Sequence, residues 1–212
     1  MYVPTAFREL DGAKLSDFIE QHSFGVLVSQ IEGVPFATHL PFLLEREAGP
    51  QGTLVGHMAR ANPQWELSRG QTVLAIFSGP HCYVSPAWYE ADNVVPTWNY
   101  VAVHASGKLE IVEDAAGLAK IVRNTTDYYE RSRPTPWKFD EDTKFAERLL
   151  TQIIGFRIQL DSIEGKWKLN QNQPAERQEK VATALHQAGS ENAKAIANLM
   201  KERLNRSRPN DS

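Results

Sequence analysis

The pattern of hydrophobic and polar positions predicts short β-strands over most of the first half of the chain. Two runs rich in β-branched and aromatic residues lie between Phe24 and Leu44, and they meet at Glu32-Gly33, which predicts a hairpin. Further strand-like runs are residues 53–58, 72–77, 83–85 and 97–112. Five or more short strands within fewer than 90 residues favour a closed or nearly closed barrel.

Helical periodicity precedes and follows these strands. Leu15, Phe18 and Ile19 share one face of a predicted amphipathic helix, and Asn62 is a good N-cap for a short helix that ends near residue 70. Further helices are predicted at residues 114–129, 145–150, 174–189 and 193–204. The run 155–163 lies between two of them and is expected to be the last strand of the barrel.

The length and composition allow one sizeable hydrophobic core. The chain has 212 residues, of which 42% are hydrophobic, so we expect one main domain with a small appendage. We predict a barrel domain over residues 1–172. Residues 173–212 are then a C-terminal helical extension that ends in a disordered tail from residue 206. The predicted class is α+β, mainly antiparallel, with peripheral and C-terminal helices.

Charge and cysteine content narrow the classes of protein and the compartment. The only cysteine is Cys82, which excludes an internal disulfide and a cysteine-based zinc site and suits a reducing compartment. No apolar stretch reaches the roughly 20 residues of a membrane span, and the first residues do not resemble a secretory signal. We therefore expect a cytoplasmic protein without a membrane partner. A net charge of −3 gives no overall attraction toward nucleic acid.

Residues 56–63 deliver an arginine from the end of a strand onto the start of a helix. Arg60 brings a guanidinium, and the helix start at Asn62 brings backbone N–H groups, so together they predict an anion site. A simpler interpretation fits as well: Asn62 only caps the helix, and Arg60 pairs with a surface carboxylate. This segment alone does not decide between them.

Residues 78–86 form a second polar cluster, where a buried strand is expected to stop. Ser78, His81 and Tyr83 follow that strand, and the glycine and proline between them fix the backbone, which favours convergence of the polar groups on a ligand. An ordinary turn with a hydrogen-bonded histidine is an equally good interpretation of the same residues.

Residues 95–100 form a third cluster at the start of a long strand. Aromatic side chains, among them Trp98, alternate there with the polar side chains of Thr97 and Asn99, so the segment can stack on a flat ring and hydrogen-bond its edge. Packing in the core or at a dimer interface is the alternative use of such rings.

Other chemistries have little support in the sequence. The histidines on the predicted strands lack metal-ligand spacing, so no metal site is predicted. Cys82 and His81 are adjacent on a strand and point to opposite faces, which is a poor arrangement for a nucleophile and its base. There is no nucleophile elbow, dinucleotide turn or Walker loop. Four basic residues of the C-terminal helices fit a solvated helix face better than a DNA-reading helix: Lys194, Lys201, Arg203 and Arg206.

Taken together, these segments resemble the PaiB family of FMN-binding negative transcriptional regulators. The resemblance rests on the start MYVP with Phe7 and on residues 39–42, 56–63, 79–86, 95–100 and 168–172. The family usually has serine before Gln171-Asn172, where this chain has Asn170. The resemblance implies a flavin-reductase-like or pyridoxamine-phosphate-oxidase-like split barrel, which is usually a homodimer with the FMN pocket at the subunit interface.

The resemblance also assigns roles to the three clusters. It implies that Arg60 and the helix start at Asn62 face the FMN phosphate, and that Trp98 and Asn99 approach the isoalloxazine ring. The set of cofactor-binding residues that it implies is His57, Arg60, Asn62, Ser78, His81, Tyr83, Thr97, Trp98, Asn99 and Lys168.

Three functions follow as hypotheses. The first is an FMN-binding regulator that contacts promoter DNA, which rests on the family resemblance alone. The second is an FMN-dependent oxidoreductase, because similar split barrels often hold FMN for hydride or electron transfer. The third is haem binding, since the chain has 6 histidines.

Overall fold

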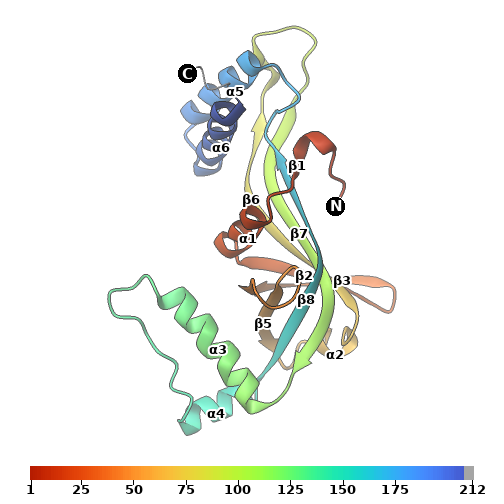
Figure 1. Ribbon diagram of the computed structural model, residues 1–212, viewed down its shortest axis with the longest axis vertical. Coiled ribbons are helices and arrows are strands. Elements are labelled where there is room, and N and C mark those ends of the chain that lie inside the picture. Colours follow the sequence, from red (N-terminus) through yellow and green to blue (C-terminus); the bar gives the residue numbers. More distant parts are fainter. Residues whose placement is uncertain (208–212) are drawn as a thin grey trace. The chain divides into compact units, whose positions relative to one another are not determined.

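The computed structural model describes residues 1–207 of the chain (Figure 1). Its strands are β1 (Arg8–Glu9), β2 (Phe24–Ile31), β3 (Val34–Pro41), β4 (Leu43–Glu45), β5 (Thr53–Ala59), β6 (Thr72–Val84), β7 (Thr97–Val112) and β8 (Ile153–Lys168). Its helices are η1 (Thr5–Phe7), α1 (Gly12–Gln21), α2 (Gln64–Leu67), η2 (Pro86–Tyr89), α3 (Ala115–Glu130), α4 (Lys144–Leu150), α5 (Ala175–Gln187) and α6 (Glu191–Ser207). Within the described chain, no helix is long and apolar enough to cross a membrane.

The strands form one sheet in the order β3-β2-β6-β7-β8-β5-β4, and β1 pairs with β8. Strand β2 pairs antiparallel with β3 and β6, and β5 pairs antiparallel with β4 and β8. The two end strands of this order are not paired with each other among the described residues, so the sheet is open. The predicted split barrel is confirmed, and a fully closed barrel is excluded.

The chain divides into two compact units. Unit 1 comprises Met1–Asp11, Ser78–Val103 and Glu164–Ser212, and unit 2 comprises Gly12–Phe77 and His104–Ile163. The long strands β6, β7 and β8 contribute residues to both units. The predicted boundary between residues 172 and 173 stays a prediction.

Unit 2 contains the predicted hairpin and an aromatic core. Glu32 and Gly33 connect β2 to β3 with φ values of +50° and +82°, as a tight two-residue turn with both φ angles positive requires. Phe42 packs edge-on against Phe77 and Phe156, with ring centroids 5.4 and 5.8 Å apart. All three rings are almost completely buried, so they fix the strands that meet in this unit.

Helix α3 covers part of the sheet of unit 2 and begins where the sequence predicts. Asp114 caps it, because the carboxylate accepts a hydrogen bond of 2.7 Å from the backbone N–H of Gly117. The helix packs closely over Gly155 of β8, where a Cβ atom would lie 2.7 Å from the Ile121 side chain and 3.2 Å from that of Leu118. A side chain at this point of the strand would therefore require the side chains of α3 to shift.

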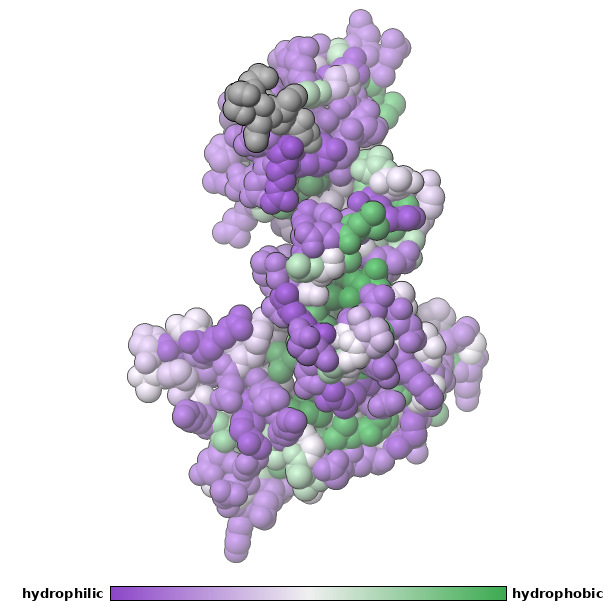
Figure 2. Space-filling view, in the orientation of Figure 1, coloured by the Kyte–Doolittle hydropathy of each residue, from purple (hydrophilic) through white to green (hydrophobic). Residues whose placement is uncertain are grey.

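Unit 1 contains the C-terminal helix pair. Leu185 of α5 and Ile196, Ala197 and Met200 of α6 are buried, and the outer face of the pair in Figure 2 is mostly hydrophilic. Helix α6 extends to Ser207, so Arg206 is helical and the predicted tail cannot begin there. The rest of that tail, residues 208–212, lies outside the described residues.

Two strands are longer than predicted. Strand β6 continues through Gly79 and Pro80, where a stop was expected. Its buried positions are odd-numbered as far as Phe77 and even-numbered from Cys82 onward, so the alternation of buried and exposed side chains shifts by one residue between them. The strand therefore continues past Gly79 and Pro80, and different alternate positions are buried before and after them. Strand β8 likewise runs on to Lys168 instead of stopping near residue 163.

Candidate functional site

One face of the sheet in unit 1 carries exposed aromatic rings. Buried and accessible residues alternate along β7. Asn99 and Val101 are buried, whereas Trp98 and Tyr100 are not. Successive strand residues point to opposite faces, so the two aromatic side chains share one face. Trp98 is 54% exposed, an unusual state for the largest apolar side chain on a strand.

Two rings from β6 extend this surface. The His81 ring lies 6.3 Å from the Trp98 ring between centroids, at an angle of 34°. The Tyr83 ring lies 6.1 Å from Trp98 in an edge-on arrangement and is 47% exposed. The Trp98 ring thus lies against both of the other rings, and the three still leave surface open to solvent, which is a suitable platform for a flat ligand.

Two lysines of β8 lie beside these rings, Lys166 buried and Lys168 half-buried. The Lys166 ammonium lies 5.2 Å from the Tyr100 ring centroid and donates a 3.1 Å hydrogen bond to the carbonyl of Tyr2. Lys168, two residues further along the strand, donates a 2.5 Å hydrogen bond to Oγ1 of Thr97. Burial lowers the pKa of Lys168 from its ordinary value.

We call this surface the aromatic–basic face. It is formed by His81, Tyr83, Trp98, Tyr100, Lys166 and Lys168.

A cavity of about 700 Å³ adjoins the three rings in unit 1. The rings of His81, Tyr83 and Trp98 line it together with Trp88 and residues around the α5–α6 connection. This volume lies within the range of sites that hold cofactors and other small ligands.

The opposite face of the sheet in unit 1 is buried. Asn99 is completely buried, and its side-chain amide donates a weak 3.4 Å hydrogen bond to the sulfur of Met200, while no described residue satisfies its Oδ1 atom. Cys82 is buried as well, and burial raises the pKa of its thiol to about 11, as the inert role predicted for it requires. Trp98 and Asn99, which were predicted to contact the same flavin ring, therefore point to opposite faces.

The remaining predicted residue of unit 1, Ser78, is exposed on β6. The other three predicted residues, His57, Arg60 and Asn62, belong to unit 2.

The hydrogen bonds at the start of the short helix differ from those that the predicted anion site requires. Helix α2 has a single turn, Gln64–Leu67. The N-cap position is Pro63, one residue later than the predicted Asn62. The Asn62 side-chain oxygen nevertheless accepts a 3.0 Å hydrogen bond from the backbone N–H of Gln64, so it occupies an N–H group that an anion would need. The same side chain donates to Oγ1 of Thr38 over 3.0 Å. Asn62 is thus held in a structural role.

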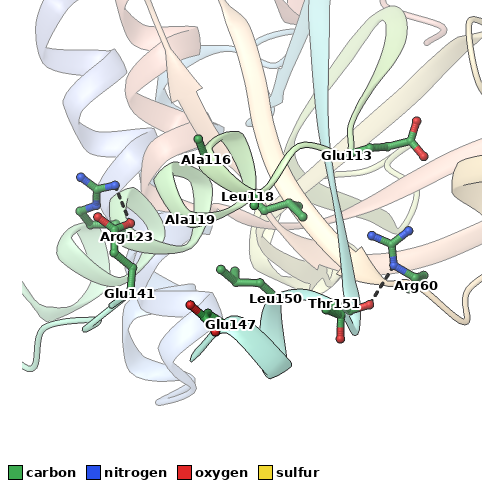
Figure 3. Close-up of a pocket in the computed structure, with 11 residues that line it drawn as sticks. Arg60, Glu113, Ala116, Leu118, Ala119, Arg123, Glu141, Glu147, Leu150 and Thr151 are labelled. Atoms are coloured by element: carbon green, nitrogen blue, oxygen red, sulfur yellow. Dashed lines mark hydrogen bonds and ion pairs between the residues drawn. The ribbon is translucent and has the colours of Figure 1, made fainter. Parts of the chain in front are cut away.

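Arg60 lies at the edge of a different cavity. Its Nε donates a 2.9 Å hydrogen bond to the carbonyl of Thr151, and the guanidinium reaches the cavity between α3 and α4 (Figure 3). His57 lies opposite Gly155 in the β5–β8 ladder, and burial lowers its pKa.

Sequence reasoning missed Lys166, and it included Tyr100 in the third cluster without naming it among the cofactor ligands. The signal for Lys166 was present in residues 164–168, where glutamate and two lysines alternate with glycine and tryptophan, as in a strand with one polar face. It was overlooked because the strand was expected to end near residue 163.

The unusual Asn170 also has a structural reason. Its backbone lies in the left-handed region with φ of +64°, which asparagine adopts more readily than serine.

The sequence matches the family model described as "Putative FMN-binding domain" over residues 1–162. It is 36% identical over 206 residues to the "Protease synthase and sporulation protein PAI 2" of Bacillus subtilis, a match that covers 96% of this chain and 98% of that protein.

Two solved structures are similar in fold. The FAD and heme binding protein from Mycobacterium smegmatis matches with a TM-score of 0.58 and 14% identity, over 76% of this chain and 73% of that one. The flavocytochrome Anf3 from Azotobacter vinelandii matches with a TM-score of 0.56 and 18% identity, over 76% of this chain and 69% of that one. At these identities the likeness concerns the fold alone.

Proposed function

Because this chain belongs to the PaiB family of FMN-binding split-barrel proteins, we propose that it binds FMN on the aromatic–basic face of unit 1. The observation that carries this proposal is the solvent-exposed contact of Trp98 with His81 and Tyr83. A soluble surface rarely leaves several large rings open side by side unless a ligand or partner covers them.

The residues of this face fit the chemistry of FMN. Its isoalloxazine ring is flat and aromatic, so the exposed faces and edges of Trp98 and Tyr83 suit stacking against it. Its phosphate is a dianion, and the ammonium groups of Lys166 and Lys168 lie on the same face of the sheet. Bound FMN supplies an acceptor for a hydride or for single electrons, and the protein binds and orients it.

The lowered pKa of Lys168 supports a ligand role. A half-buried ammonium with one hydroxyl partner, Oγ1 of Thr97, is incompletely compensated for the water that it has lost. An anionic group on this face would supply the missing charge. We therefore assign the phosphate to Lys168.

Roles in FMN binding for His57, Arg60 and Asn62 stay predictions, because these residues belong to unit 2. Asn99 faces the buried side of β7, so the proposal does not use it as a flavin contact.

We further propose that the protein acts as a negative transcriptional regulator of the PaiB type, as a cytoplasmic homodimer that contacts promoter DNA. The support is family membership together with the extent of the Bacillus subtilis match, which covers 96% of this chain. In this proposal, a second copy covers the part of the exposed aromatic surface that FMN leaves open.

The regulatory role is tested by a DNA-shift assay at low salt, where electrostatic binding is strongest. Fragments upstream of the protein's own gene and of neighbouring genes are compared with a scrambled fragment, with and without FMN. A specific shift that FMN changes supports the proposal. Failure to shift any fragment, together with steady NAD(P)H oxidation by the flavin-loaded protein, would instead favour an oxidoreductase.

A further inference from the structure

Unit 2 contains a second cavity, apart from the aromatic–basic face. It has a volume of about 670 Å³ and lies between α3, α4 and the end of β5 (Figure 3). Leu118 and Ala119 of α3 and Leu150 of α4 form its apolar lining, and they belong to a small hydrophobic cluster that includes Phe139 and Ile153. The volume and the apolar lining are those of a small-molecule site.

One cation at the rim of this cavity is held in place and has free donors. The Arg60 backbone N–H donates to the carbonyl of Gln152 over 2.8 Å, and the side-chain Nε donates to the carbonyl of Thr151 over 2.9 Å. Within residues 1–207, neither terminal nitrogen of the guanidinium has a hydrogen-bond or ion-pair partner. The guanidinium is therefore oriented in advance, and its two remaining nitrogens can bind an anion.

The other charged groups at the rim determine the orientation of a ligand. Glu113 is paired with Arg69, and Arg123 is paired with Glu141, each over 2.8 Å. Glu147 has no ion-pair partner among the described residues, and Figure 3 shows it on the far side of Leu150 from Arg60. One end of the cavity thus attracts a negative group, and the other end repels it.

We propose that this cavity binds a monocarboxylate with a medium-sized apolar body. The carboxylate accepts hydrogen bonds from the two terminal nitrogens of Arg60, and the hydrocarbon part covers Leu118 and Leu150. A single negative group is expected, because a second one at the other end would meet Glu147. This proposal is independent of FMN binding on the aromatic–basic face.

The anion at Arg60 has a second conceivable source, since the sequence prediction places the FMN phosphate there. The experiment therefore uses octanoate as the probe, with and without saturating FMN. Binding is followed by NMR shifts of the backbone amides of Ala116, Ala119 and Thr151, all of which line the cavity.

Octanoate is expected to shift these amides in the wild-type protein, and octan-1-ol, which lacks the charge, is expected to bind about tenfold more weakly. Arg60→Ala should weaken octanoate binding at least about tenfold, and Arg60→Lys should recover part of it. Arg133→Ala removes an exposed arginine outside the cavity and should change nothing. Ala116→Phe fills the cavity from an exposed helix position without changing the charge, and it should also abolish binding.

Three results would overturn the proposal. The first is octanoate affinity unchanged in both Arg60 variants. The second is absence of saturable shifts in the wild-type protein at millimolar octanoate. The third is displacement of octanoate by stoichiometric FMN, which would assign Arg60 to the flavin phosphate instead.

Discussion

The side-chain amide of Asn170 donates a 2.9 Å hydrogen bond to the hydroxyl of Tyr89, and both groups are buried in unit 1. Asn170 follows β8 by two residues and has a φ of +64°. One residue thus provides both a left-handed backbone and a buried hydrogen bond next to the end of the strand that carries Lys168.

Asn170→Ser, which restores the residue usual in the family, is expected to destabilise this protein by about 1–2 kcal/mol. Serine tolerates the left-handed backbone less well than asparagine and is too short to reach Tyr89. Asn170→Gly keeps the backbone and loses only the hydrogen bond, so it should be less harmful. Urea unfolding measures the free energy of unfolding of both variants. A serine variant as stable as the wild type would contradict this interpretation.

The half-buried His57 imidazole predicts a loss of stability in acid. Burial lowers its pKa, and its Nδ1 has no hydrogen-bond partner among the described residues. The unfolded chain therefore takes up a proton here at a higher pH than the folded chain does, so stability falls as the pH decreases below about 6.5.

His57→Gln should reduce the fall in melting temperature between pH 7.5 and 5. The exposed His81 provides the matched control, because His81→Gln should leave the fall unchanged. His22, whose pKa burial also lowers, is present in all three proteins and contributes equally. If the melting temperature fell equally in the wild type and in His57→Gln, the loss of stability in acid could not be assigned to His57.

Gly107 of β7 is expected to tolerate no side chain. A Cβ atom there would lie 1.9 Å from the backbone oxygen of Gln159 on β8, and neither strand can move without breaking its pairing. Gly107→Ala should therefore destabilise the fold by about 3 kcal/mol or more. Gly12→Ala, at a position with no neighbouring atom within 4 Å, should stay within about 0.5 kcal/mol of the wild type. Thermal unfolding compares the two.

Lys168→Met tests the assignment of the FMN phosphate. We expect FMN affinity to fall about tenfold and riboflavin affinity to stay unchanged, because riboflavin has no phosphate. Lys108→Met, at an exposed position of β7, is the control. The Lys168→Met protein should remain as stable as the wild type, since the substitution removes a partly desolvated charge. Equal losses for both flavins would show that Lys168 contacts another part of the cofactor.

Local signals predicted much of the fold. The Glu32-Gly33 turn, the Asp114 cap and the apolar face of α6 each depend on residues close together in the sequence, and each was confirmed. The ends of strands were harder to predict. Gly79 and Pro80 are typical of the end of a strand, but here they lie within β6, where the alternation of buried side chains shifts by one residue.

The sequence predicted several residues of the candidate site, but it did not predict which of them share one face of the sheet. The sequence identified Trp98, His81 and Tyr83, yet it joined them to Asn99, although adjacent strand residues point to opposite faces. Contacts such as that of Lys166 with Tyr100 join residues 66 positions apart, and no local pattern indicates them.

The exposed ring of Trp98 allows a direct test of FMN binding on the aromatic–basic face. Trp98→Ala removes the ring that contacts both His81 and Tyr83, and it should weaken FMN binding about tenfold. Trp137, which is 60% exposed in unit 2, provides the matched control, since Trp137→Ala removes an equally accessible ring far along the chain from this face.

The measurement is a titration of FMN by flavin fluorescence against the wild-type, Trp98→Ala and Trp137→Ala proteins, with desalting and visible absorption to count retained flavin. We expect the wild-type and Trp137→Ala proteins to retain FMN with equal affinity, and Trp98→Ala to bind it about tenfold more weakly. Equal affinity in all three proteins, or no retained flavin in the wild type, would contradict FMN binding on the aromatic–basic face.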